Sequence, residues 1–232
     1  IAGGIGFPVI FELPQKHFSW ERLSMHTRVV LSTTFALLLF GTLLLKLTEN
    51  ISWLGAFFYS VSARTAGFST YNLGDFSTAG LLVVSGLMFI GASPASTGGG
   101  IKTTTFFVLL SGIYSAATNH SERAFHSAIP KDAFRKASVI SMLAVFLVMT
   151  ASYLMLIFDP QLSLRDVLFE MISAFSTSGL STGITPQLSA PSRILSILMM
   201  YIGRLGPLTV ASLWYFTIGE RVRYPEGTIA IG

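Results

Sequence analysis

Two short segments built around glycine are the part of this chain best suited to chemistry. Residues 65–68 read Thr-Ala-Gly-Phe and residues 177–180 read Thr-Ser-Gly-Leu, and each follows a short apolar stretch. A central glycine allows backbone angles that a side chain would forbid, so extended backbone there can turn its carbonyl groups towards one axis. Carbonyl oxygens arranged around an axis can replace the hydration shell of a potassium ion. The candidate ion-binding residues are therefore Thr65, Ala66, Gly67, Phe68, Thr177, Ser178, Gly179 and Leu180.

The same glycines allow a second interpretation, because glycine in an apolar helix also permits close packing between helices. One such segment would be weak evidence for conduction. Two copies occur at an offset of 112 residues, each after a short apolar stretch and before an interrupted one. This arrangement favours a site for a monovalent cation formed by backbone oxygens, with no side-chain metal ligands and no organic cofactor.

Three basic side chains fall at membrane depth, where a cation is costly and usually functional. Arg64 directly precedes the first glycine segment. We expect it to support that segment, with Glu170 on the second short apolar stretch as its partner. Lys102 and Arg204 lie in glycine-rich interruptions of apolar stretches. Lys102 either acts within its interruption or extends its ammonium group to the cytoplasmic face, and Arg204 could simply bond exposed carbonyls at a helix break.

The composition indicates a membrane protein. Apolar residue types make up 51% of the 232 residues and charged types only 11%, against roughly 25% charged residues in a soluble domain. A chain so poor in charge cannot cover its folded surface with polar side chains, which excludes a soluble globular enzyme and also intrinsic disorder. The absence of cysteine excludes disulfides, thiolate metal sites and cysteine nucleophiles. The net charge of +4 is too small to indicate a nucleic-acid partner.

The apolar stretches predict an all-α membrane fold with three kinds of helix. Two stretches are long enough to cross a bilayer, since about 20 residues are needed. Two more are interrupted at glycine and proline, so that the two halves of each form one discontinuous span. Two shorter stretches suit helices that enter the membrane partway and return as extended backbone. In that order the ranges are Val29–Leu47 and Ala137–Phe158, then Ala79–Ile90 with Phe106–Ala117 and Ile194–Tyr201 with Leu208–Ile218, then Ile51–Ser62 and Leu162–Phe175.

These helices form an internal repeat of long span, short helix, extended loop and interrupted span. Residues 57–70 align with residues 169–182, and the flanking spans align at the same offset. Basic side chains gather in three of the segments between spans, which the positive-inside bias places in the cytoplasm. We therefore expect the tail of an earlier repeat at 1–13, cytoplasmic linkers at 14–28 and 118–136, complete repeats at 29–117 and 137–218, and a cytoplasmic C-terminal segment at 219–232.

Four longer motifs resemble a known family. They read SARTAGFST, MFIGASPASTGGGIKTTTF, FSTSGLSTGIT and MYIGRLGPLT, in this order. Together they are similar to the Trk/Ktr/HKT superfamily of potassium and sodium transporters, and most similar to the membrane subunits of bacterial Ktr systems (KtrB type). The resemblance covers essentially the whole chain, which would correspond to the second half of such a subunit: the end of the second repeat, then the third and fourth repeats.

The resemblance implies a pore and a gate. Helix–pore-loop–helix (M1-P-M2) repeats would surround one cation pore with pseudo-fourfold symmetry, and residues 65–68 and 177–180 would be the third and fourth filter strands. The glycine-rich interruption of the third repeat would form an intramembrane gate loop beneath the filter, and Arg204 would bond its hydroxyl or carbonyl groups. The gate residues would be Gly91, Ser93, Ser96, Thr97, Gly98, Gly99, Gly100, Lys102 and Arg204.

From this resemblance we expect potassium uptake down the electrochemical gradient, in the cell membrane of a bacterium, by a multi-pass homodimer. Its expected partners are membrane lipid and a cytoplasmic ring of nucleotide-binding regulatory subunits (KtrA-like, of the RCK/KTN type). The nearest alternative is a sodium-preferring relative. Two remote alternatives are a non-conducting scaffold and a polytopic membrane enzyme, although the sequence lacks the intramembrane histidines or paired carboxylates that such an enzyme needs.

Overall fold

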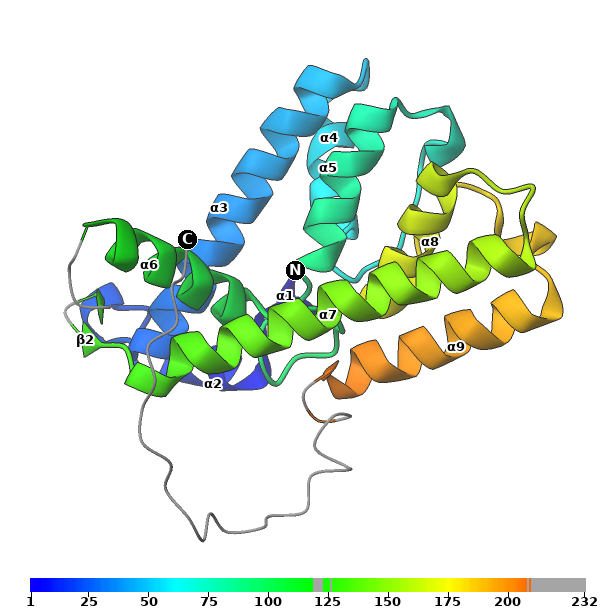
Figure 1. Ribbon diagram of the computed structural model, residues 1–232. Helices are drawn as coiled ribbons and strands as arrows, with labels where there is room; N and C mark the ends of the chain where they lie inside the picture. The colour runs from blue at the N-terminus through cyan, green and yellow to red at the C-terminus, as the bar shows by residue number, and fades with distance from the viewer. Residues whose placement is uncertain (119–122, 126, 208, 210–232) are drawn as a thin grey trace, which may run out of the picture.

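The computed structural model describes residues 1–118, 123–125, 127–207 and 209, and this part of the chain is mostly helical (Figure 1). The elements, in chain order, are α1 (Ala2–Ile5), α2 (Phe7–Gln15), η1 (Trp20–Arg22), α3 (Met25–Thr48), α4 (Trp53–Ser62), η2 (Leu73–Asp75), α5 (Thr78–Phe89), α6 (Thr103–Thr118), β1 (Arg123–Ala124), β2 (Ser127–Ala128), α7 (Lys131–Phe158), α8 (Leu164–Ser176), η3 (Thr185–Gln187) and α9 (Ala190–Leu205).

Within the described residues, α3 and α7 are the two helices that are long and apolar enough to cross a membrane. Both begin earlier than their apolar stretches predict. The hydroxyl of Ser24 accepts a hydrogen bond from the backbone N–H of Thr27 and so caps the start of α3. Pro130 precedes α7, whose first turn carries Asp132. The expected linker at 118–136 therefore contains the first turn of α7 as well as the β1–β2 hairpin.

The two short helices, α4 and α8, end where the glycine segments begin. Serine caps the start of each: Ser52 accepts from the N–H of Gly55 at 3.0 Å, and Ser163 accepts from the N–H of Asp166 at 3.2 Å. Neither is long enough to cross a bilayer. The prediction of a short helix followed by non-helical backbone is confirmed at both positions.

The predicted interruption between α5 and α6 is present. Residues 90–102 form a loop whose ends meet at a parallel bridge between Ile90 and Ile101. The interruption near Gly203 starts later than expected, because α9 runs through this glycine and ends at Leu205, before Gly206 with φ of 91°. The expected second half of this span and the C-terminal segment lie outside the described residues, apart from position 209.

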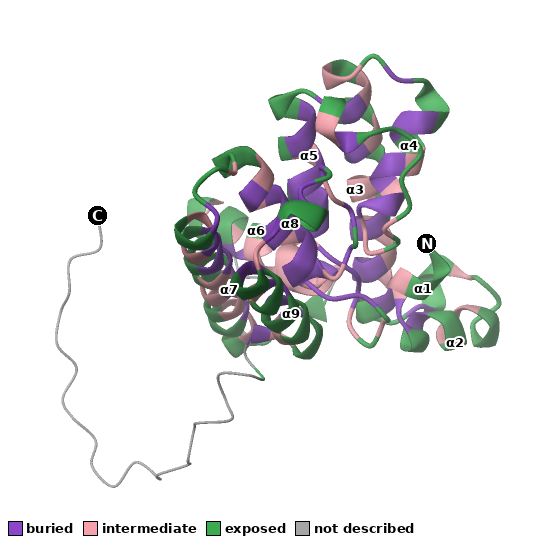
Figure 2. Ribbon diagram, turned by 90° about the vertical axis from the view of Figure 1, so that its right-hand side faces the viewer, coloured by how far each residue is buried: buried purple, intermediate pink, exposed green. Residues whose placement is uncertain are grey.

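The helices pack as two groups, α3 with α4 and α5, and α7 with α8 and α9 (Figure 1). Helix α8 packs on α5 and α6 packs on α7, and these contacts join the groups. Buried residues concentrate where α5 and α8 meet, whereas the outer faces of α7 and α9 are exposed (Figure 2). Many exposed side chains are large and apolar, such as Phe35 on α3 and Met142 on α7. Such a surface suits contact with lipid rather than water.

Candidate cation site

The two glycine segments share an unusual backbone conformation. In the first, φ is 70° at Thr65 and 76° at Gly67; in the second, φ is 55° at Thr177 and 87° at Gly179. The residue between each pair has negative φ. Regular strand backbone turns successive carbonyl groups to opposite sides, whereas alternation in the sign of φ turns them to the same side. Four residues at positive φ, two of them threonines, are a strained arrangement of the kind found at functional sites.

The two segments lie against each other, although 112 residues separate them in the chain. A Cβ atom added to Gly67 would lie 2.1 Å from the carbonyl oxygen of Ser178 and 3.5 Å from the Cα of Gly179. Only glycine permits this approach at position 67. The sequence expectation that both glycines occupy one place is met by this geometry, and neither lies within a helix.

Hydrogen bonds occupy the N–H groups of these segments but few of their carbonyls. The N–H groups of Ala66 and Gly67 both donate to the carbonyl of Ser62, at 3.0 and 3.1 Å. Those of Thr177 and Ser178 donate to α8. Within the described part of the chain, no hydrogen bond reaches the carbonyl oxygens of residues 65–67 or 177–180. Phe68 differs from the other predicted ion-binding residues, because its carbonyl accepts a hydrogen bond from the Ser62 hydroxyl.

The interruption between α5 and α6, which we call the glycine loop (residues 91–102), lies directly against both segments. A Cβ added to Gly98 would lie 2.4 Å from Oγ1 of Thr65, and one added to Gly99 would lie 2.9 Å from Oγ1 of Thr177. The N–H of Gly99 donates to the Thr177 hydroxyl at 3.0 Å. The loop is thus seated on the threonines that begin the two segments.

The first half of the glycine loop is bonded to the N-terminal segment of the chain. The N–H groups of Ser93 and Thr97 donate to the carbonyls of Gly4 and Gly3, at 2.9 and 3.3 Å. The N–H of Phe7 donates in return to the carbonyl of Ala95 at 3.1 Å. The carbonyl of Pro94 lies so near Gly6, at φ of 96°, that a side chain there would collide with it.

Within the loop, side chains bond to backbone and to each other. Ser96 donates to the carbonyl of Ser93 at 2.5 Å, and the Ser93 hydroxyl accepts from Thr103 at 2.9 Å. The ammonium group of Lys102 donates to the carbonyl of Gly98 at 2.6 Å. Lys102 therefore spans the second half of the loop, whose backbone at Gly100 has φ of 74°.

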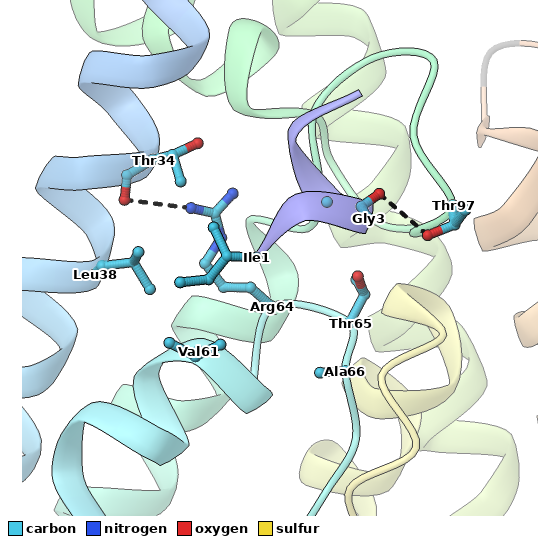
Figure 3. A pocket seen from close by; sticks show the side chains of 10 residues that line it. Ile1, Gly3, Thr34, Leu38, Val61, Arg64, Thr65, Ala66 and Thr97 are labelled. Atoms are coloured by element: carbon cyan, nitrogen blue, oxygen red, sulfur yellow. Dashed lines mark hydrogen bonds between the residues drawn. The ribbon is translucent and has the colours of Figure 1, made fainter. Parts of the chain in front are cut away.

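The expected pairing of Arg64 with Glu170 is not made. The guanidinium of Arg64 donates to the carbonyl of Gly91 at 3.2 Å and, in a longer contact of 3.5 Å, to that of Thr34 (Figure 3). Glu170 instead accepts a hydrogen bond from Thr185 at 2.6 Å. Arg64 faces the other way, across a cavity of about 160 Å³, because α3 and the glycine loop pack on its side of α4. Arg64 thus joins the first glycine segment to the start of the glycine loop.

Arg204 does not make the expected bonds to the loop. Its side chain is exposed, and no hydrogen bond joins it to Ser93, Ser96 or Thr97 in the structure as described. It lines a cavity of about 510 Å³ with Thr177 and Gly179. Its charge is close enough to Lys102 for the two to repel each other. Arg204 therefore lies beside the second glycine segment and not within the loop's hydrogen bonds.

The sequence reasoning missed two carboxylates that connect helices within each group. Glu49 follows α3 and accepts from the N–H and the hydroxyl of Ser77, at 2.9 and 2.6 Å. Asp159 follows α7 and accepts from the N–H and the hydroxyl of Ser189, at 3.1 and 2.9 Å. Hydrogen bonds from Ser192 and Ser189 hold the pKa of the Asp159 carboxyl below its usual range. The repeat offset between Ser77 and Ser189 was the signal that could have revealed them.

Tyr59 on α4 was also missed. Its ring is fully buried, and its hydroxyl oxygen lies 2.8 Å from the N–H of Tyr71 and 2.7 Å from that residue's carbonyl. It contacts the backbone that directly follows the first glycine segment. No spacing in the sequence distinguishes it from the other aromatic residues of the short helix.

Comparison with known proteins identifies the family. Residues 20–217 match the TrkH family, described as a cation transport protein. The chain belongs to this family. It is 37% identical to the Ktr system potassium uptake protein B of Vibrio alginolyticus, over all of this chain and 54% of that protein. It is 32% identical to the potassium/sodium uptake protein NtpJ of Enterococcus hirae, over all of this chain and 55% of that protein.

The fold is that of a solved family member. The crystal structure of the potassium transporter TrkH from Vibrio parahaemolyticus superposes with a TM-score of 0.72, at 18% identity, over 92% of this chain and 50% of that one. This TrkH-family chain is therefore a mostly helical membrane protein. It spans about half the length of the curated relatives it matches.

Proposed function

We propose that this TrkH-family chain supplies two of the four repeats of a potassium-uptake pore. On this proposal α3, α4 and α5 with α6 form the third helix–pore-loop–helix repeat, and α7, α8 and α9 begin the fourth. The relatives, at about twice the length, would supply two more repeats in the corresponding positions. Four such units can surround one axis, and the chain would then cross the cell membrane of a bacterium several times.

One observation carries the proposal: two equivalent segments meet with alternating φ and with carbonyl oxygens that accept no hydrogen bond from the described residues. Backbone carbonyls buried in a membrane protein normally have partners. A dehydrated potassium ion is a partner that such oxygens can hold. Because the Phe68 carbonyl is bonded to Ser62, we assign ion contact in the third strand to Thr65, Ala66 and Gly67, and in the fourth to Thr177, Ser178, Gly179 and Leu180.

The glycine loop is proposed as the gate. It lies against Thr65 and Thr177, at one end of both filter segments, so it would obstruct ions that leave them. Its movement would break the bond from Gly99 to Thr177 and the bond from Lys102 to Gly98, while Gly98 to Gly100 absorb the change in backbone angles. Lys102 and Arg204 add positive charge near this path, which would oppose a cation while the loop is seated.

A sodium-transporting relative is the second candidate. The observation in its favour is the similarity to NtpJ, whose name includes sodium and which is matched along the whole chain. A non-conducting scaffold or a membrane enzyme has no comparable support. The proposed assembly is a homodimer in membrane lipid, with a KtrA-like ring of nucleotide-binding subunits that contacts the segment at 118–136, part of which lies outside the described residues.

Uptake by the full-length gene product in cells that depend on imported potassium tests the function. We expect the wild type to restore growth at low potassium, and Gly67→Ser or Gly179→Ser to abolish uptake or admit sodium. Gly86→Ser is the matched control, because Gly86 lies on α5 with open space where a side chain would be. Ion preference unchanged in both filter variants would contradict the filter assignment. Sodium uptake by the wild type at the rate of potassium would favour the second candidate.

A further inference from the structure

We infer that Tyr59 is a positioning residue for the filter, acting through the backbone that follows Gly67; this inference rests on the proposed function. Tyr59 lies on α4, three residues before Ser62. It does not itself contact the proposed ion-binding carbonyls. Its hydroxyl group determines where the outer end of the third filter strand is held.

The Tyr59 hydroxyl is fully used by one short stretch of backbone. Its oxygen accepts hydrogen bonds from the N–H groups of Thr70, at 3.2 Å, and Tyr71, at 2.8 Å. Its proton is donated to the carbonyl of Tyr71 at 2.7 Å, and the hydroxyl of Ser69 lies 2.8 Å away. A phenol offers one donor and two acceptor positions, so this backbone saturates it.

The stretch that Tyr59 holds has little else to fix it. Residues 68–72 are all exposed, with the Phe68 side chain 72% exposed. In the part of the chain that the structure describes, residues 68–71 make no backbone–backbone hydrogen bond. Apart from the bond from Ser62 to the Phe68 carbonyl, their attachments to α4 come from Tyr59.

The ring of Tyr59 is itself held rigidly. It is 0% exposed and packs against Phe76, at 5.2 Å between ring centroids, and against Tyr71 at 6.1 Å. The ring of Tyr71 in turn covers Gly55, where an added Cβ would lie 3.0 Å from it. A rigid ring places its hydroxyl at a fixed point, and a filter that discriminates between cations requires its supporting groups to be fixed in this way.

The ratio of potassium to sodium uptake in Tyr59→Phe tests the inference. The substitution removes the hydroxyl and keeps the ring, so we expect the ratio to fall about threefold to tenfold. Tyr153→Phe is the matched control, because it removes the same atom from a tyrosine that is 66% exposed on α7. A purely structural effect would reduce the amount of folded transporter and lower the uptake of both ions equally, leaving the ratio unchanged.

A ratio within twofold of wild type in folded Tyr59→Phe would overturn the inference. If Tyr59→Phe does not fold, Ser69→Ala decides, because it removes only the hydroxyl beside Tyr59 and leaves α4 intact. We expect Ser69→Ala to lower the ratio at least about twofold, and an unchanged ratio would again overturn the inference. Failure of the wild type to take up either cation would contradict the proposed function instead, so the two failures are distinguishable.

Discussion

The two helix groups follow one plan up to the glycine segment and differ after it. In both, a serine caps the short helix, a carboxylate after the long helix binds the serine that caps the third helix, and a threonine and a glycine at positive φ follow the short helix. The equivalent serines and glycines keep the offset of 112 residues. Positions that set backbone geometry are therefore the ones that repeat.

The segments after the glycines are held by different means. After Gly67 the chain is exposed and is attached through the hydroxyl of Tyr59. After Gly179 it is held by burial, since Leu180 is 2% and Thr182 9% exposed. Glu170 accepts from Thr185 in this second group. Two copies of one backbone geometry can thus be stabilised by unrelated side chains.

The largest expected effect separates the two glycines. Gly67→Ala combines positive φ with a clash against the Ser178 carbonyl, whereas at Gly179 the nearest atom to an added Cβ is 4.0 Å away. Positive φ alone costs a side chain about 1–2 kcal/mol. In uptake assays of the full-length protein we expect Gly67→Ala to lose at least about 100-fold and Gly179→Ala about tenfold. Equal losses would show that contact between the segments does not matter.

The second comparison concerns the two carboxylates. Asp159 is 4% exposed, whereas Glu49 is only half-buried. Removing a buried charged acceptor is the more costly change, so Asp159→Asn should destabilise the protein by about 1.5–3 kcal/mol and Glu49→Gln by less. Thermal unfolding of the purified full-length protein measures both. A larger loss in Glu49→Gln would contradict the assignment of Asp159 as the stronger connection.

The third comparison concerns the two threonines beneath the glycine loop. Thr177 accepts a hydrogen bond from Gly99, whereas Thr65 only contacts Gly98. If the loop is a gate, Thr177→Ala should release it and raise potassium uptake about twofold to tenfold, as expected from loss of one hydrogen bond. Thr65→Ala serves as the control and should change uptake less. Reduced uptake in Thr177→Ala would indicate that the hydroxyl supports the filter and not the closed loop.

The smallest effect is a dependence of stability on pH at Asp159. Its pKa is lower in the folded protein than in the unfolded chain, so it stabilises the fold above the unfolded pKa of about 4, and this contribution is lost as the pH falls through the folded pKa. The difference in melting temperature between wild type and Asp159→Asn should therefore narrow from pH 7 to pH 3. A difference that stays constant over this range would exclude the carboxylate charge as its cause.

Much of the fold was readable from the sequence because its signals are local. Apolar runs of sufficient length predicted α3 and α7, glycine and proline predicted the interruption after α5, and the offset between Gly67 and Gly179 predicted two equivalent segments. Helix ends were less accurate. Polar residues extend α7 back to Lys131, since a helix continues past its apolar part wherever its backbone can be capped.

By itself the sequence determined where the backbone can bend, because glycine, proline and capping serine act on their own neighbourhood. Only the tertiary structure decided which groups meet: Arg64 bonds to Gly91 and not to Glu170, the Phe68 carbonyl bonds to Ser62, and Tyr59 holds Tyr71. A side chain's partner depends on which distant elements pack on its side of a helix. That choice is made by the whole set of contacts, and no local spacing encodes it.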